Sequence, residues 1–523
     1  MSKAETADEH IASDDAHGGA WTPLRLEVFR ALWLAALVSN IGTWMQNVAA
    51  VWYMTSLTSS PLMVALVQAA TSLPMFLVGL PAGAAADIFD RRRLLLWTQG
   101  WMLVIAGVLA VLTFAGLMNA SLLLALTFAL GLGAAVNAPS WQALTPEVVP
   151  QPELSRAIAL NALTVNLGRA LGPALGGFVV AAAGPALVFA LNAFSFVGVL
   201  AVVYRWRRAA ATRSVLPAER LLGATRAGLR YARHAPPLAA VLVRTGLFML
   251  CASAFWALLP VIARAELGAT IGAVLLPRLR RRLSSDGLTG LATVVFALVS
   301  VLTASWRWLP GLWGVMVIGG LAWIAMMASL NAAAQTTVPS WVRARALGVY
   351  LVVFQGGLGL GSALWGVVAE RIGTQPALAL AGGTLVIGLA AIPRWRLVGA
   401  LDLASSAHWP EPHVVTMPGA DSGPVHVQVE YRIDPAHARE FAAAMQELRE
   451  VRRRDGALAW SVYRDPAEPG RYVEIFTVES WVEHLRQHER VTTADRAIEE
   501  RVRRFHRGGS PPAVIHLIAE RSS

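Results

Sequence analysis

Long apolar runs, separated by short polar connections, fill most of residues 29–393. A helix needs about 20 apolar residues to cross the hydrocarbon core of a bilayer. On this basis the pattern predicts twelve membrane spans, at residues 29–54, 60–86, 94–117, 121–142, 155–182, 185–204, 238–263, 267–277, 286–304, 309–332, 346–369 and 375–393. The predicted fold class is an all-α polytopic membrane protein with two six-helix halves.

The eighth predicted span, residues 267–277, is far shorter than the others. A helix of that length would measure about 16 Å, roughly half the hydrocarbon thickness. Two interpretations stay open. The segment is either a half-helix or re-entrant segment beside a binding site, or a span truncated by a deletion, which would leave an impaired copy. We favour the deletion.

Basic residues gather in alternate connections between the predicted spans. They include Arg91, Arg92 and Arg93 after the second span, the arginines of residues 205–233, and Arg343 and Arg345 before the eleventh span. Because short cytoplasmic loops carry an excess of Lys and Arg, these connections and both chain termini are predicted to be cytoplasmic. Glu370 and Arg371 are exceptions in outer connections that otherwise carry few charges.

The predicted organisation has six parts. Residues 1–26 form a disordered cytoplasmic tail, 27–204 and 238–396 the two membrane halves, 205–237 a central cytoplasmic loop, 397–424 a linker, and 425–523 a cytoplasmic domain. Similar runs, Asn137 to Trp141 and Asn331 to Trp341, end the fourth and tenth spans, which is typical of parallel repeats in transporters. Residues 218–233 of the central loop predict an amphipathic helix on the inner membrane surface.

The pattern changes after the linker. Alternating apolar residues predict strands at 425–433, 457–463, 471–477 and 513–518, and helical periodicity predicts helices at 435–454 and 480–507. The order βαββαβ predicts an α+β ferredoxin-like domain.

Composition agrees with a membrane protein. Hydrophobic residues make up 55% of the chain and charged residues 15%, with a mean hydropathy of +0.52, whereas about 25% of residues are charged in ordinary globular chains. Residues 425–523 hold 16 Arg and 16 Asp or Glu, so the net charge of +11 lies before them, where it orients helices and meets lipid headgroups. The expected partners are therefore the bilayer and a small-molecule substrate, and not nucleic acid. Cys251 is the only cysteine, which excludes an intrachain disulfide, and neither a metal nor a cofactor is predicted.

Polar residues inside predicted spans are candidate substrate contacts, because they are costly in lipid and usually face an interior cavity. The candidates are Asn40, Gln46, Asn47, Asn166, Arg169 and Gln355. Arg169 lies too deep to reach the interface easily. It is either the fixed charge of a site for an anionic or catecholate-like substrate, or it bonds backbone carbonyls at a helix bend. No Asp or Glu lies in the middle of a predicted span, so the usual acidic proton carrier is not visible.

Two motifs resemble those of the major facilitator superfamily. One is the hairpin Gly83-Ala-Ala-Ala-Asp87 followed by Arg91 and Arg92, and the other is the fifth-span run Gly168-Arg-Ala-Leu-Gly172-Pro173-Ala-Leu-Gly176-Gly177, similar to the superfamily's exporter motif. The runs from Ser39 to Asn47 and from Trp341 to Arg345 resemble the enterobactin-exporter-like branch. The resemblance implies a proton-driven secondary exporter of a siderophore-like, drug-like or anionic molecule in a cell (inner) membrane.

The resemblance also implies conformational roles. Asp87 would pair across the half interface near the start of the eleventh helix, close to Arg343 and Arg345, with Arg91 as its charge partner. The other interpretation is that the hairpin only anchors topology. Ile88 and Asp90 depart from the superfamily pattern, which has a basic residue and a glycine there. In the fifth span the glycines would form a smooth packing face, and Pro173 would bend the helix.

In the last domain, Glu474 and the run Trp481-Val-Glu-His484 resemble the antibiotic-biosynthesis-monooxygenase-like dimeric α/β barrel domains. His484 and His488 lie one helical turn apart and would bind a ligand or haem, or else form a solvated surface pair, which is the commoner case. Domains of this kind commonly dimerise, so a homodimer is a possible assembly. The alternatives to an exporter are a membrane-anchored enzyme or ligand sensor and a degenerate transporter copy.

Overall fold

The computed structural model describes residues 21–206, 221–262, 285–306, 308–339, 341–397 and 421–520, together with residues 403, 406, 409, 414, 418 and 419. Within these residues, 11 helices are long and apolar enough to cross a membrane. They are α2 (Glu27–Leu57), α3 (Pro61–Ile88), α4 (Arg91–Phe114), α5 (Ala120–Val148), α6 (Leu154–Ala183), α7 (Pro185–Arg205), α9 (Pro236–Ile262), α10 (Ser285–Ser305), α11 (Leu309–Thr336), α12 (Arg343–Ile372) and α13 (Thr374–Gly388).

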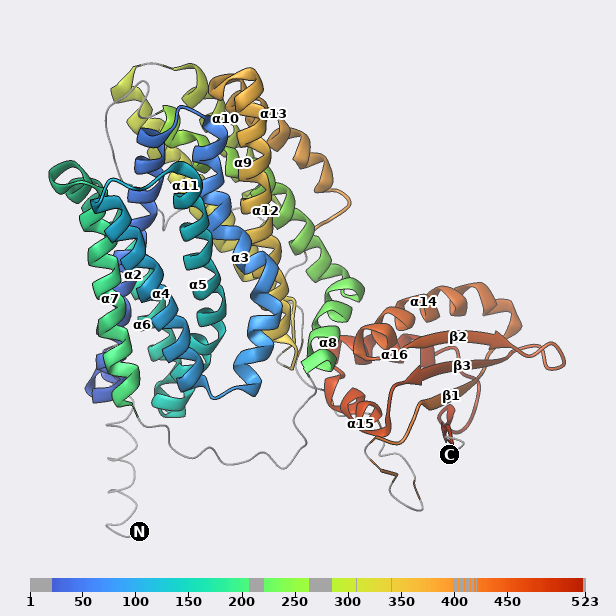
Figure 1. The fold of residues 1–523 in the computed structure, drawn as a ribbon. Coiled ribbons are helices and arrows are strands. Elements are labelled where there is room, and N and C mark those ends of the chain that lie inside the picture. The colour runs from blue at the N-terminus through green and yellow to red at the C-terminus, as the bar shows by residue number, and fades with distance from the viewer. Residues whose placement is uncertain are drawn as a thin grey trace, which may run out of the picture.

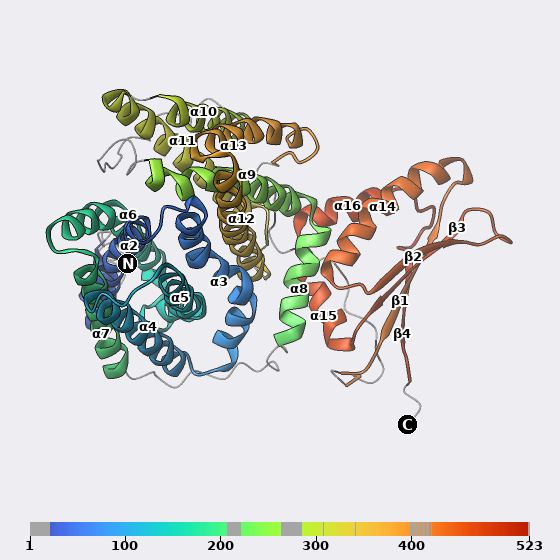
Figure 2. The same ribbon diagram turned by 45° about the horizontal axis from the view of Figure 1, so that its top comes forward.

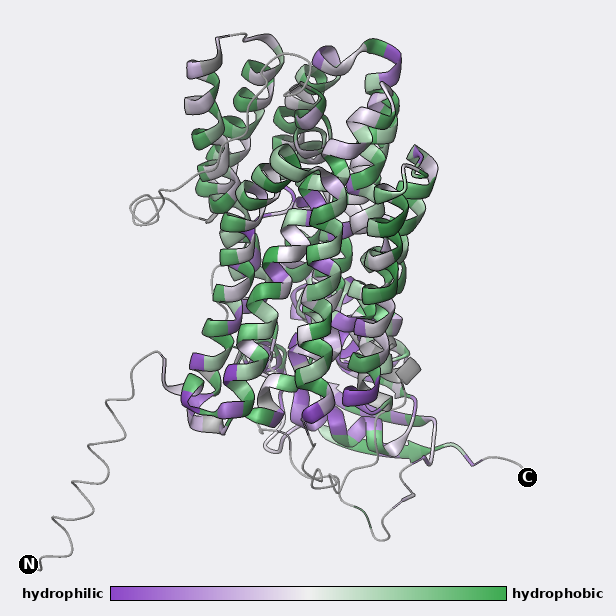
Figure 3. Ribbon diagram, turned by 60° about the vertical axis from the view of Figure 1, so that its left-hand side comes forward, coloured by the Kyte–Doolittle hydropathy of each residue, from purple (hydrophilic) through white to green (hydrophobic). Residues whose placement is uncertain are grey.

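These helices match eleven of the predicted spans to within a few residues, and the polytopic fold class is confirmed. The short eighth span, residues 267–277, lies outside the described residues. Apolar residues run along the length of the helices, and hydrophilic residues gather toward the end of the bundle that adjoins the C-terminal domain (Figure 3). This banding is what a bilayer-spanning bundle requires.

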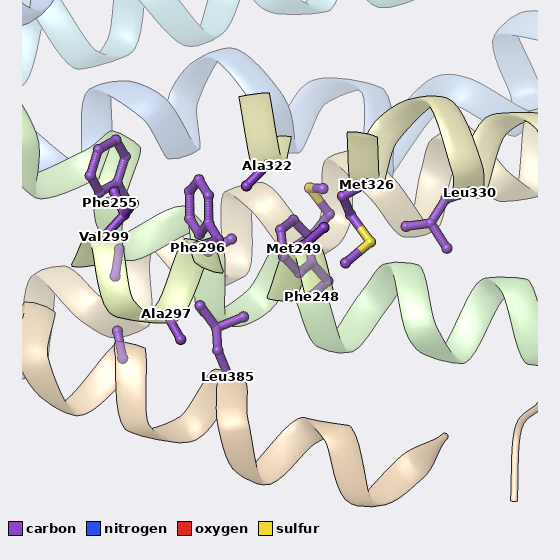
Figure 4. Packing of buried hydrophobic residues seen from close by; sticks show 14 of the residues in the cluster. Phe248, Met249, Phe255, Phe296, Ala297, Val299, Ala322, Met326, Leu330 and Leu385 are labelled. Carbon is purple, nitrogen blue, oxygen red and sulfur yellow. The ribbon is translucent and has the colours of Figure 1, made fainter. Parts of the chain in front are cut away.

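Helices α2–α7 form one bundle and α9–α13 the other, and α3 packs lengthwise against α12 between them (Figures 1 and 2). The C-terminal half has an aromatic core (Figure 4). Phe248 and Phe255 on α9 pack against Phe296 on α10, with ring centroids 5.6 and 5.3 Å apart. Met326 on α11 and Leu385 on α13 belong to the same buried cluster. Four helices of this half therefore share one packed core.

Helix α8 (Leu221–His234) lies between the membrane helices and the C-terminal domain (Figure 1). Part of its apolar face packs on protein instead of on the membrane surface: Tyr231 and Ala232 are buried against Val338, Val342 and Ala346 where α11 connects to α12, whereas Leu229 is exposed. The Tyr231 hydroxyl donates to the Thr337 carbonyl at 3.3 Å. The amphipathic pattern is thus satisfied by protein, and α8 links the two domains.

The C-terminal domain holds a four-stranded antiparallel sheet in the order β2-β3-β1-β4. The strands are β1 (Val425–Arg432), β2 (Ala459–Arg464), β3 (Arg471–Val478) and β4 (Ala513–Ile518), and α14 (Ala438–Asp455), α15 (Trp481–Arg490) and α16 (Thr493–Arg503) cover one face (Figure 2). This is the predicted ferredoxin-like arrangement.

The single helix predicted at 480–507 is wrong, since two helices, α15 and α16, occupy it. Helix α15 ends at Arg490, and Thr492 caps the start of α16: its side chain accepts from the Asp495 amide, while the Asp495 carboxylate accepts from the Thr492 amide. This reciprocal capping box stabilises a new helix start at a point where the apolar periodicity continues.

Candidate functional site

Close approach of α3 and α12 joins the two halves. A Cβ on Gly356 would lie 2.4 Å from Phe76 Cδ2, one on Gly359 2.9 Å from Leu73 Cγ, and one on Gly366 2.8 Å from an alanine Cβ on α3. Glycine at these positions therefore permits the contact. The sequence analysis did not single out these glycines, although the run of glycines at 356, 357, 359 and 361 was a signal for close packing.

A polar contact ties the two halves at the start of α3. The Glu370 carboxylate on α12 accepts hydrogen bonds from the Ser60 hydroxyl at 2.8 Å and the Leu62 amide at 3.2 Å. An anion at this place is stabilised by the free amides and the positive dipole end of the helix. Glu370 thus caps a helix of the other half, a role that explains a charge in a connection otherwise nearly free of charge.

The α3–α4 hairpin lies at the other end of α3. Arg91 pairs with Glu147 on α5, with an N–O distance of 2.5 Å, and Arg92 donates to the Val203 carbonyl at 3.1 Å and to the Tyr204 carbonyl at the end of α7. Asp90, which departs from the superfamily glycine, accepts from the Arg93 amide and caps α4. These contacts hold the hairpin against α5 and α7 of the N-terminal half.

The structure describes only part of the expected contact between this hairpin and the start of α12 in the other half. The side chain of Asp87 lies outside the described residues, and a Cβ on Gly83 would meet nothing within 4 Å. Leu80 packs with the cluster that includes Val342 and Ala346 at the start of α12, so this end of α3 adjoins α12. Arg343 donates to the nearby Val338 carbonyl at 3.4 Å, and Arg345 packs against Gly228 on α8.

The fifth-span motif packs α6 against α2. A Cβ on Gly168 would lie 3.0 Å from Asn40, one on Gly172 2.4 Å from Trp44 Cβ, and one on Gly176 2.8 Å from Met45 Cα. Three glycines one turn apart thus form the smooth face that allows the two backbones to touch. Pro173 lies inside the helix, and Gly177 is half-buried beside this face.

Arg169 lies on the same helix, next to this contact. Its guanidinium carbon is 5.3 Å from the Trp44 ring centroid, a cation–π distance, and its side chain is otherwise exposed. No carboxylate of the described residues forms an ion pair with it. Asn40 donates to the Thr164 hydroxyl at 3.2 Å. The α2–α6 contact therefore brings Asn40 and Arg169 together.

The other polar candidates separate into two groups. Gln46 is buried and accepts from the Asn192 amide on α7 at 2.5 Å, so its side chain holds two helices of one half together. Asn166 is exposed and Asn47 and Gln355 are half-buried, and none of the three side chains has a hydrogen bond within the described part of the chain.

His484 and His488, in the C-terminal domain, are not a solvated surface pair. His484 is 1% exposed, and its Nε2 lies 3.4 Å from Nε2 of His488. Burial, and then nearby His516 and His488, lower the pKa of His484 to about 3, while burial and His516 lower the pKa of His488 to about 4. Both imidazoles are therefore uncharged at neutral pH.

Three comparisons relate this chain to known proteins. The family model MFS_3, described as "Transmembrane secretion effector", matches residues 18–523, which include the membrane helices and the tail domain. The chain belongs to this family. The chain is therefore a multi-pass membrane protein of a transporter family of the exporter type, and not a member of an enzyme family.

Two curated relatives of the chain are exporters by name. The Enterobactin exporter EntS of Shigella boydii is 27% identical over 380 residues, covering 69% of this chain and 90% of the relative. The Multidrug efflux pump Tap of Mycolicibacterium fortuitum is 29% identical over 420 residues, covering 73% of this chain and 98% of the relative.

Solved structures support the transporter fold. A POT family transporter in complex with 5-aminolevulinic acid aligns with a TM-score of 0.56 at 12% identity, covering 70% of this chain and 96% of that chain. A bacterial homologue of the human lysosomal transporter Spinster, in an inward-facing and unoccupied conformation, aligns with a TM-score of 0.53 at 14% identity, covering 72% and 96%.

Proposed function

We propose that this protein exports a small organic molecule across the cell (inner) membrane by secondary active transport driven by protons. The names of the curated relatives support export. Alternating access requires two rigid halves that rock against each other about a fixed site. The protein has two separately packed halves that meet along a glycine-lined α3–α12 contact, and this observation carries the proposal.

In the proposed cycle the α3–α12 contact is the pivot. The Glu370–Ser60 contact ties one end of it, and the hairpin with Gly83, Asp87, Arg91 and Arg92 controls the other, next to Arg343 and Arg345. The hairpin end and both termini are cytoplasmic in this proposal, since arginines concentrate there. The exporter motif with Gly168, Gly172, Pro173, Gly176 and Gly177 keeps α6 close to α2 while the halves move.

The proposed substrate is anionic or aromatic. Arg169 supplies a cation without a carboxylate partner among the described residues, and Trp44 supplies an adjacent ring. A guanidinium within a membrane-spanning helix favours an anion, because its charge is otherwise uncompensated. Asn40, Asn47, Asn166 and Gln355 complete the candidate set of polar contacts, which suits catecholate-like, drug-like or other anionic metabolites.

Efflux from cells tests this function. The full chain is expressed in cells stripped of their own exporters, and accumulation of a panel of dyes, antibiotics and catechol siderophores is followed with and without an uncoupler. Extrusion that stops on addition of the uncoupler supports proton-driven export. Unchanged accumulation of every compound, with protein present and folded in the membrane, contradicts it.

The tail domain is proposed to form a homodimer through the sheet face that its helices leave uncovered. Apolar residues lie on this face: Val473 and Ile475 on β3, and Ile515 and Leu517 on β4, of which the last two are half-exposed. Such a face is a candidate interface. The mass of the detergent-solubilised protein, with and without Ile515→Glu, tests this assembly: a dimer that the substitution converts to a monomer supports it.

A further inference from the structure

Helix α15 carries buried polar groups that have no hydrogen-bond partner. Trp481, His484 and Gln487 are 2%, 1% and 0% exposed. Nε1 of Trp481, Nδ1 of His484, and both polar atoms of the Gln487 carboxamide form no hydrogen bond. Gln487 lies near enough to His484 to counteract the lowering of its pKa, but no well-aligned bond joins them. More than 90% of buried polar groups in proteins are satisfied, so four such atoms in one place are exceptional.

His484 lies one helical turn from each of the other two residues, since positions 481, 484 and 487 are spaced by three, and its ring centroid is 5.5 Å from that of Trp481. His516 on β4 faces them: its ring centroid is 4.7 Å from that of His484 and 6.0 Å from that of Trp481. The cluster therefore occupies the space between α15 and the edge strand of the sheet.

The charged groups beside the cluster are already paired. Arg452 binds Glu474 at 3.1 Å and Glu499 at 2.7 Å, and Glu474 also accepts from Trp460 and Tyr431. With the imidazoles neutral, the site offers a carboxamide, an indole N–H and imidazole nitrogens, and no free charge. Such a lining matches an uncharged ligand, since a charged one would be buried without compensation.

A residue of the linker covers this region. The Trp409 ring lies 4.9 Å from the ring of His488 and 4.8 Å from the guanidinium carbon of Arg452, and its N–H donates to Glu499 at 2.8 Å. Aromatic rings of Trp409 and Trp481 thus flank the histidines, which favours a planar molecule.

We propose that Trp481, His484 and Gln487 form a binding site for a small, uncharged, planar molecule that carries both a hydrogen-bond donor and an acceptor. The four unpartnered atoms are the recognition groups. Leaving a buried polar group without a hydrogen bond costs free energy, and a ligand that bonds these groups recovers part of that cost. The site lies apart from the membrane helices and from their proposed substrate contacts.

Helix α15 also contacts the membrane part, beside α14, whose Glu450 lies 3.2 Å from His234 on α8. Glu483 accepts from Arg230 on α8 at 3.3 Å, and the Arg490 guanidinium carbon lies 4.6 Å from the ring of Trp341, in the connection between α11 and α12. Arg490 also binds Glu483 at 2.6 Å. Because α15 contributes both to the site and to the contact with α8, the proposal includes a coupling in which occupancy of the site tightens that contact.

Binding of benzamide to the full chain in detergent micelles tests the site, since benzamide is planar and uncharged and has both donor and acceptor groups. Saturation-transfer NMR compares the wild type with Gln487→Leu and with the matched control Gln446→Leu, at an exposed position on α14. Saturable binding that weakens at least tenfold in Gln487→Leu and persists in Gln446→Leu is expected. No saturable binding to the wild type, or equal binding to all three, overturns the proposal.

Stability distinguishes a binding site from a structural role without any ligand. Unfolding of the C-terminal domain by urea is measured in the full chain. The reporter is the oxidation of Met445 by peroxide, since this residue is 1% exposed in the folded domain. Gln487→Leu is expected to raise the unfolding midpoint, because it removes unsatisfied polar atoms, whereas Glu474→Gln lowers it. A fall in the midpoint for Gln487→Leu overturns the proposal. Gln487→Met, which also removes the carboxamide, replaces Gln487→Leu if that variant does not fold.

Hydrogen exchange tests the coupling. Benzamide is expected to slow exchange in α8, and Glu483→Gln, which weakens the contact with Arg230 but leaves the site intact, is expected to abolish that protection while binding persists. Unchanged exchange in α8 on binding overturns the coupling. None of these readouts requires export, so failure of the proposed transport activity is distinguishable from failure of the site.

Discussion

The Glu370 carboxylate accepts a hydrogen bond from the Ser60 hydroxyl at 2.8 Å and so joins the end of α12 to the start of α3. The two residues are 310 positions apart and belong to different halves of the bundle. The carboxylate also accepts from the Leu62 amide, which makes it a helix cap supplied by the opposite half. Any motion that separates the halves at this end breaks these bonds.

Replacing Glu370 by Ala is predicted to favour separation of the halves at this end. Loss of a helix cap costs about 0.5–2 kcal/mol, and 1.4 kcal/mol corresponds to a tenfold change in population. Spin labels at Thr58 and Thr374, in a Cys251→Ser background, report the separation as a distance distribution. We expect a larger population at long distances in Glu370→Ala and no change in Arg371→Gln, the exposed neighbouring control. Identical distributions for all three proteins would remove the gating role.

The glycines of α12 give a matched pair of substitutions. Gly356→Ala places a methyl group against Phe76 and is predicted to lower the thermal unfolding temperature, since overpacking typically costs about 1–3 kcal/mol. Gly348→Ala, on the same helix, meets nothing within 4 Å and is predicted to be neutral or stabilising, because Ala exceeds Gly in helix propensity by about 1 kcal/mol. Thermal unfolding in micelles measures both. Equal effects at the two positions would mean that the α3–α12 contact is looser than described.

The tail histidines predict a pH dependence of stability. Because the pKa values of His484 and His488 are lowered in the folded domain to about 3 and about 4, the unfolded chain binds protons first as the pH falls below about 6.5. The free energy of unfolding should therefore fall by about 1.4 kcal/mol per pH unit for each histidine between about pH 6 and pH 4.

Urea unfolding at a series of pH values, with Met445 oxidation as the reporter, measures the pH dependence of the free energy of unfolding. The double variant His484→Gln, His488→Gln should flatten the slope over that interval, whereas substitution of exposed His437 should leave it unchanged. A slope that is the same in the double variant and the wild type would show that both imidazoles titrate normally.

Arg169 is predicted to be needed for export of anionic compounds. Arg169→Gln removes the only charge identified at the α2–α6 contact and should lower export at least tenfold, while Arg169→Lys, which keeps the charge but loses the planar group over Trp44, should retain part of it. Initial efflux rates, normalised to protein in the membrane, provide the comparison. Undiminished export by Arg169→Gln would assign Arg169 to helix packing.

The membrane helices follow directly from the apolar runs, because lipid requires every backbone group to be satisfied within the helix. The packing role of Gly168, Gly172 and Gly176 is also visible from their spacing. The partners of Glu370 and Gln46 are not, since Ser60 and Asn192 are far away in the sequence and only tertiary packing brings them together.

Burial of His484 illustrates a different difficulty. Polar residues surround it in the sequence, so the pattern indicates a surface helix, but the domain is small and α15 lies between the sheet and α8. Two of its faces are therefore covered. The break between α15 and α16 is difficult to predict for a similar reason. The apolar pattern continues across it, and only the Thr492–Asp495 capping box marks the start of a new helix.

Transport by the purified protein in liposomes tests the central claim most directly. The full chain is reconstituted, a pH gradient is imposed, and movement of an anionic catecholate or dye is followed before and after addition of an uncoupler. Proton-driven alternating access predicts accumulation against a concentration gradient that collapses with the uncoupler. Folded protein that moves none of the tested compounds, or moves them equally without a gradient, would contradict it.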